Sequence, residues 1–127
     1  MKRLTASLLL AGTSLICASN TWAWSSDGDK IKLTEGEIAF CRTWQNDGTL
    51  VMYARQKGQP TPTYPDDAYS EPSDEQKKMR AYFIREAKNV QVANTEKEHV
   101  AVSEAFGVRM LNRCVGFITS RPSKKEP

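Results

Sequence analysis

The chain has 127 residues, of which 18 are Lys or Arg and 15 are Asp or Glu, and its formal net charge is +3. That length suits one small domain with a modest core. Lys2 and Arg3 carry most of the basic excess: without them 16 basic and 15 acidic residues remain, so nothing in the charge favours nucleic acid or an anionic membrane as a partner.

Residues 1–23 have the organisation of a signal peptide. Lys2 and Arg3 form a positive n-region, residues 4–18 are uncharged and mostly apolar, and residues 21–23 (TWA) place small side chains where a signal peptidase reads them. The apolar stretch is shorter than the roughly 20 residues of a membrane span, which disfavours the alternatives of an uncleaved anchor or a buried N-terminal helix. We therefore expect cleavage after residue 23, no membrane span in the mature form, and export to the periplasm, with secretion as the second choice.

The cysteines predict one disulfide. Cys17 lies in the signal peptide, behind the bulky Leu15 and Ile16 rather than the small residue typical of a lipidated cysteine, and should be removed with it. Cys41 and Cys114 remain, and an oxidising compartment favours their pairing over a reactive thiol pair, since there is no Cys-x-x-Cys motif. Closing a loop of about 73 residues should add on the order of 4 kcal/mol.

A first helix is predicted from Thr34, whose partner Glu37 completes a capping box. Apolar or small residues then recur at steps of three and four, which is the repeat of one helical face: Ile38, Cys41, Trp44, Gly48, Val51 and Ala54. The helix should stop at Gly58. Asp47-Gly48 is a weak point at which it could break.

Residues 58–73 form a Pro-rich connection. Pro60, Pro62, Pro65 and Pro72 exclude a helix there and favour an extended, polyproline-like path. We call this segment the crossover.

Two more helices follow, at Ser73 with Gln76 in the capping-box place and at Thr95 with Glu98. The apolar face of the second consists of Met79, Tyr82, Phe83, Ala87 and Val90. The third carries one stripe of Ala101, Ala105, Val108, Leu111, Val115 and Ile118, and another of Gly107, Met110, Cys114 and Phe117. So much apolar circumference predicts contacts on more than one side. The helix should end at residues 120–122, before a disordered tail (121–127).

The disulfide constrains how these helices run. Cys41 is early in the first helix and Cys114 late in the last, so a bond between them requires the two helices to be antiparallel. The short turn at residues 92–95 makes the second and third antiparallel as well. The first and second then run the same way, and the crossover must return along a whole helix. The predicted fold is an all-α, three-helix domain (24–120) with one disulfide.

Candidate catalytic and metal-binding residues are few. His99 is the only histidine, and the sequence places no carboxylate and nucleophile beside it. The acidic residues around the crossover lack the regular spacing of a calcium loop: Asp66, Asp67, Glu71, Asp74 and Glu75. We expect no metal site and no cofactor, and the chain is not expected to be an enzyme.

The crossover also carries Tyr64 and Tyr69 between its prolines and acids. A rigid loop that presents tyrosines offers the amphipathic anchors that protein interfaces favour. Tyr64, Asp66, Asp67 and Tyr69 are therefore the candidate binding residues. The alternative is that both tyrosines fold back and cover the edge of the core, as we expect of Trp44.

With a cysteine in the first helix, another in the last and about 100 mature residues, the chain resembles in outline the small exported two-cysteine helical proteins of Gram-negative bacteria. Some of those proteins are inhibitors or immunity proteins for cell-wall-active enzymes. The missing catalytic constellation, the disulfide-linked scaffold and the Tyr, Pro and Asp residues of the crossover predict a non-enzymatic protein that binds another envelope protein, of the inhibitor, immunity or adaptor type. The alternatives are a small envelope enzyme that uses the carboxylates near the crossover, with or without His99, and a small-ligand carrier with a cavity between its helices.

Overall fold

The computed structural model describes residues 23–122. In chain order its elements are β1 (Ser25–Asp27), β2 (Lys30–Lys32), α1 (Glu35–Gln56), the 3-10 helix η1 (Pro65–Ala68), α2 (Asp74–Ala87) and α3 (Glu96–Thr119). The predicted signal peptide, Cys17 included, lies outside the described residues except for Ala23, and so does the predicted tail from residue 123 onward.

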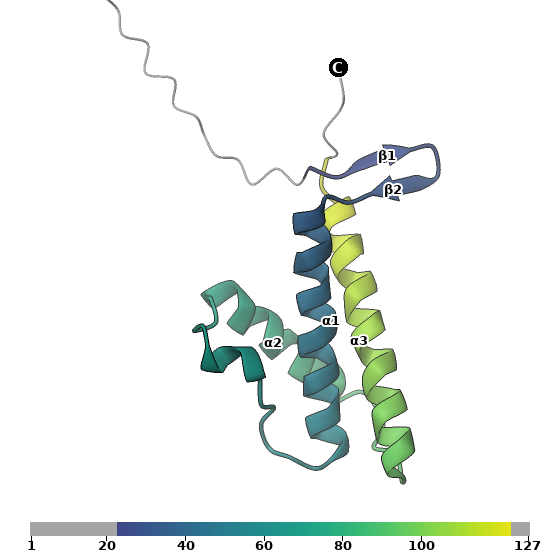
Figure 1. Ribbon diagram of the computed structural model, residues 1–127. Helices are drawn as coiled ribbons and strands as arrows, with labels where there is room; N and C mark the ends of the chain where they lie inside the picture. Colours follow the sequence, from purple (N-terminus) through teal and green to yellow (C-terminus); the bar gives the residue numbers. More distant parts are fainter. Residues whose placement is uncertain (1–22, 123–127) are drawn as a thin grey trace, which may run out of the picture.

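The predicted three-helix arrangement is confirmed. α1 and α3 lie side by side and run in opposite directions, and α2 covers one face of the pair (Figure 1). Cys41 and Cys114 are disulfide-bonded with their Cα atoms 5.4 Å apart, as the antiparallel arrangement requires. The short turn after α2 leads directly into α3.

All three helices begin at the predicted caps. Thr34 and Thr95 each form a complete capping box, with Glu37 and Glu98 respectively. At α2 the Ser73 hydroxyl accepts from the backbone N–H of Gln76, but the Gln76 side chain donates to Asp47 on α1 instead of returning to the cap. A tertiary partner has replaced the local one.

α1 is continuous through the predicted weak point, and Gly48 lies where the backbones of α1 and α3 approach closely. A Cβ added to Gly48 would meet the Met110 side chain at 2.9 Å, and one on Gly107 would lie 2.0 Å from the Thr49 hydroxyl oxygen. Two glycines thus let the backbones of α1 and α3 approach each other, and their absent side chains are a packing requirement rather than a break in the helix.

The crossover departs from its predicted extended path. Residues 65–68 form η1, which begins with a proline where a helix tolerates one. The crossover also returns only to the middle of α1, where Gln76 and Arg80 of α2 meet Asp47. α2 has 14 residues and α1 has 22. α2 runs in the same direction as α1 and covers only part of it, so the crossover does not need its full length to return and can form the 3-10 turn.

A two-stranded hairpin precedes α1 and was not predicted. β1 and β2 pair antiparallel, with Asp27 opposite Lys30. Gly28 has a φ of +59°, at the first central position of a two-residue turn, the place that type II′ turns reserve for glycine. The strands are only three residues long and lack strong alternation, so this turn is their main sequence signal.

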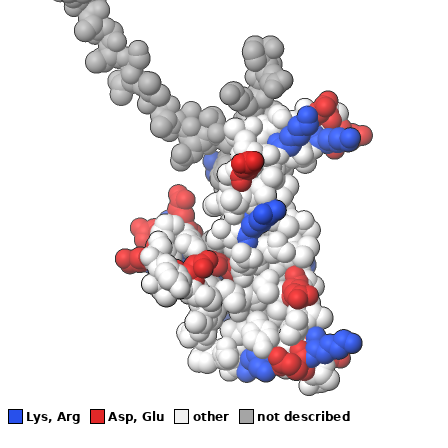
Figure 2. Space-filling model, viewed as in Figure 1, with Lys and Arg blue, Asp and Glu red and all other residues white. Residues whose placement is uncertain are grey.

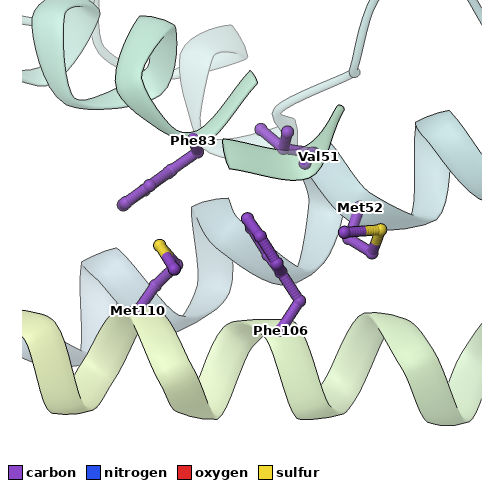
Figure 3. Packing of buried hydrophobic residues seen from close by; sticks show 6 residues of the cluster. Val51, Met52, Phe83, Phe106 and Met110 are labelled. Atoms are coloured by element: carbon purple, nitrogen blue, oxygen red, sulfur yellow. The ribbon is translucent and has the colours of Figure 1, made fainter. Parts of the chain in front are cut away.

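The core forms where the three helices meet. Figure 3 shows Phe83 of α2 facing Phe106 and Met110 of α3 beside residues of α1, and all three are essentially buried. A second cluster surrounds the disulfide and Ile118. Each predicted stripe of α3 is buried in part: Met110, Cys114 and Ile118 are buried, whereas Val108 is 45% and Phe117 is 40% exposed.

Candidate functional site: the crossover surface

The crossover is fastened to the helices through Arg80. This residue lies in the inward repeat of α2 with Phe83 and Ala87, and only 6% of it is exposed. Its Nε donates to Asp47 Oδ2 at 2.8 Å. Its two terminal nitrogens donate to the two carboxylate oxygens of Asp67, each at 2.8 Å. One guanidinium therefore joins α1, η1 and α2.

Tyr64 closes this network from the crossover side. The Arg80 guanidinium carbon lies 3.6 Å from the centre of the Tyr64 ring, a stacked cation–π arrangement in a half-buried place. The same ring packs against the central core. Residues 64–67 are thus held by stacking, by a bidentate ion pair and by the 3-10 turn.

The charges in this network stabilise one another. Burial acts to lower the pKa of Arg80, but its hydrogen bonds to Asp67 and Asp47 outweigh burial and raise it above the ordinary value. The hydrogen bond from Arg80 lowers the pKa of Asp67. Burial raises the pKa of Tyr64, which the nearby cation opposes. At neutral pH the Asp67 carboxylate and the Arg80 guanidinium are both ionised, as a tight bidentate pair requires.

The outer side of the crossover is acidic and presents one aromatic ring. Tyr69 is 92% exposed, although its backbone N–H bonds to Asp66 O within the turn. Exposed acids lie around it along the chain, namely Asp66, Glu71, Asp74 and Glu75. Figure 2 shows red side chains gathered over the crossover and the start of α2. We call Asp66, Tyr69, Glu71, Asp74 and Glu75 the crossover surface.

The four candidate binding residues therefore separate into two pairs. Tyr64 and Asp67 turn inward to Arg80, while Asp66 and Tyr69 face solvent. The alternative was that both tyrosines cover the core. Tyr64 packs against it, whereas Tyr69 is 92% exposed. Whether Asp66 and Tyr69 bind a partner stays a prediction.

Arg80 and Asp47 are the residues that the sequence analysis missed. Both occupy positions in the apolar repeats of their helices, Asp47 between Trp44 and Val51 and Arg80 before Phe83. The sequence did contain a signal for this ion pair. Asp47 and Arg80 carry opposite charges at core-facing positions of two different helices, and buried charges in proteins are usually paired.

His99 belongs to a different cluster, where the end of α1 meets the start of α3. Its Nε2 donates to Ala93 O at 2.8 Å, and its Nδ1 lies 3.6 Å from Glu96 Oε2. Glu96 also accepts from Tyr53 and Lys57. His99 and the crossover carboxylate Asp67 thus have separate partners.

Within residues 23–122, no three His, Cys, Asp or Glu side chains are grouped so that they could hold a metal ion. None of the helices in this range is long and apolar enough to cross a membrane. A shallow groove follows the outer face of α1, lined by Glu35, Ile38, Ala39, Arg42, Thr43 and Asn46. It lies on a single helix and is not the interhelical cavity expected of a ligand carrier.

Comparison with known proteins finds no matching family model, no similar curated protein and no similar solved structure.

Proposed function

We propose that this chain is a small exported, non-enzymatic periplasmic protein that works by binding another envelope protein through the crossover surface. The observation that carries the proposal is the 92% exposure of Tyr69 on a segment that Arg80 fastens to two helices. Export rests on the predicted signal peptide.

Rigidity supports this function. A loop that is ordered before binding loses little conformational entropy when a partner docks. Here the ion pair and the stacked ring hold residues 64–67, so the turn that carries Tyr69 is preorganised. A tyrosine adds a large contact area with few rotatable bonds, and such rings often dominate the binding energy of an interface.

Charge supports a particular kind of partner. The surface around Tyr69 is rich in exposed carboxylates, so a complementary surface would be basic, with an apolar recess for the ring. Such complementarity mainly raises the rate of association and excludes acidic competitors. An inhibitor or immunity protein for a basic envelope enzyme would meet this description.

The test is capture of partners from a periplasmic extract by the purified, oxidised mature domain. Tyr69→Ala should weaken capture of a specific partner roughly tenfold or more, since loss of an interface anchor costs upwards of about 1.4 kcal/mol. Added salt should weaken capture too, because it screens exposed charges. Val92→Ala is the matched control: Val92 is also exposed, at 45%, but precedes α3 instead of lying in the crossover.

The two variants separate the outcomes. Loss of capture with Tyr69→Ala, retained with Val92→Ala at an unchanged melting temperature, supports the proposal. Equal capture by both variants would show that the crossover surface is not the binding site. If no partner is captured while the domain stays folded, the binding function itself is contradicted.

A further inference from the structure

The disulfide is enclosed by the fold. Cys41 and Cys114 are 1% and 0% exposed. Partly buried apolar side chains from several elements pack against the cluster that the two cysteines form with Ile118, among them Trp24, Leu33, Phe40, Leu111 and Val115. Thiol–disulfide exchange requires a thiolate to reach one sulfur directly, so some of this cover has to move before the bond can react.

Two of the covering residues belong to the N-terminal strap, which we define as residues 24–33. Trp24 stands just before β1 and Leu33 just after β2, so the hairpin joins two points that both rest on the disulfide cluster. The Trp24 indole N–H also donates to the carbonyl of Arg121, beyond the end of α3, at 3.0 Å. The hairpin lies at the end of the helix pair where α1 begins and α3 ends (Figure 1).

The strap is the part of this cover that can open at least cost. No strand residue is buried, and the strands pair only with each other. A lone two-stranded hairpin is marginally stable, and elements with few buried contacts open well before the whole domain unfolds. Phe40, Leu111 and Val115 belong instead to the long helices, which pack along their length at Gly48 and Gly107.

We propose that the N-terminal strap is a gate for the Cys41–Cys114 disulfide, and that the bond exchanges with external thiols only when the strap lifts while the helices stay folded. In reduction by a dithiol, one thiolate attacks a cysteine sulfur and the other cysteine leaves as a thiolate. The second thiol of the reductant then attacks the mixed disulfide. The reductant loses two electrons and becomes a cyclic disulfide, and the protein gains two thiols.

The experiment follows reduction of the mature domain by dithiothreitol under native conditions, with thiol alkylation and mass measurement at timed intervals. Trp24→Ala should raise the reduction rate roughly tenfold or more, since it removes the main attachment of the gate. Ile31→Ala is the matched control, because Ile31 lies in the strap but is 51% exposed. Its reduction rate should equal that of the parent protein.

Two further variants keep the proposal testable if Trp24→Ala destabilises the whole domain. Gly28→Ala strains the turn, because the φ of Gly28 is +59°, and adds no contact, because nothing lies within 4 Å of the new Cβ. It loosens the strap from a distance and should also accelerate reduction. Met52→Ala weakens the core, where Met52 is fully buried, and should leave the reduction rate unchanged if the gate controls it.

The reverse pattern overturns the proposal. If Gly28→Ala and Trp24→Ala react at the parent rate, the strap is not the barrier. If Met52→Ala accelerates reduction in proportion to its loss of stability, the bond is reached by global unfolding. Acceleration confined to the two strap variants supports the gate.

Discussion

Arg80 shows how a single residue joins distant parts of this chain. Its position in α2 belongs to the inward repeat, where an apolar side chain is expected, yet it carries a charge whose partners come from α1 and the crossover. Both it and Asp47 are almost fully buried. Breaking such a pair from one side is far more costly than the pair's net contribution, because the remaining charge stays buried without a partner.

Arg80→Ala should therefore destabilise the domain by about 3–5 kcal/mol, as expected when one partner of a buried ion pair is removed. Urea unfolding at neutral pH measures this. Arg85→Ala, on the same helix but exposed, is the control and should change stability by no more than about 0.5 kcal/mol. Equal effects of the two substitutions would contradict a structural role for the Arg80 network.

At the scale of elements, the ends of the helices are tied to each other by side chains of α1. Arg55 donates to the carbonyls of Lys88 and Val90 after α2, and the buried Gln56 bonds both Gln91 O and Ala93 N. These contacts hold the short turn that makes α2 and α3 antiparallel. The next residue, Lys57, reaches Glu96 in the first turn of α3.

The Lys57–Glu96 contact makes part of the stability depend on pH. The hydrogen bonds from Lys57 and Tyr53 lower the pKa of Glu96 from 4.5 to about 2. Because the folded pKa lies below the unfolded one, this stabilisation is fully present above about pH 4.5 and is lost as the pH falls toward 2.

Glu96→Gln should thus be less stable than the parent at pH 6, and the difference should shrink as the pH falls toward about 2. Urea unfolding midpoints measured between these pH values test this. Lys57→Met should behave alike, since Lys57 is the largest cause of the shift. A difference that stays constant over the whole range would show that Glu96 does not contribute in its charged form.

At the scale of the whole molecule, two apolar clusters hold α1 and α3 together. One is the core between the three helices, and the other surrounds the disulfide near the hairpin. α2 covers only part of the α1–α3 pair. The part near the hairpin, which α2 does not cover, is therefore held together by the disulfide cluster. A domain of this size has little stability to spare.

Removing the disulfide should accordingly cost about 4 kcal/mol, the loop-closure value for a separation of 73 residues. Urea unfolding of Cys41→Ala/Cys114→Ala measures it, and the fully reduced parent protein should lose a similar amount. A loss below about 1 kcal/mol would mean that the unfolded chain is not appreciably restrained by the bond.

The helices, their antiparallel long pair and the disulfide could be predicted because their causes are local or are limited to two cysteines. Thr34, Ser73 and Thr95 each satisfy an N–H a few residues away, so their effect is visible in a short stretch of sequence. For the candidate site, the sequence pointed to Tyr64, Asp66, Asp67 and Tyr69 but not to which of them face solvent. Which of its side chains turn inward depends on Arg80, which lies 13 residues beyond Asp67.

The amino-acid sequence by itself determined where the helices begin, their repeat, and which two cysteines pair, since capping, periodicity and the small number of cysteines need no knowledge of distant neighbours. Only the tertiary structure decided the roles of Gly48, Arg80 and Tyr69. Close approach of two backbones, pairing of buried charges and exposure of a ring arise from elements that meet in space. The physical reason is that each of these free energies depends on what surrounds a group, and those surroundings exist only after the chain has folded.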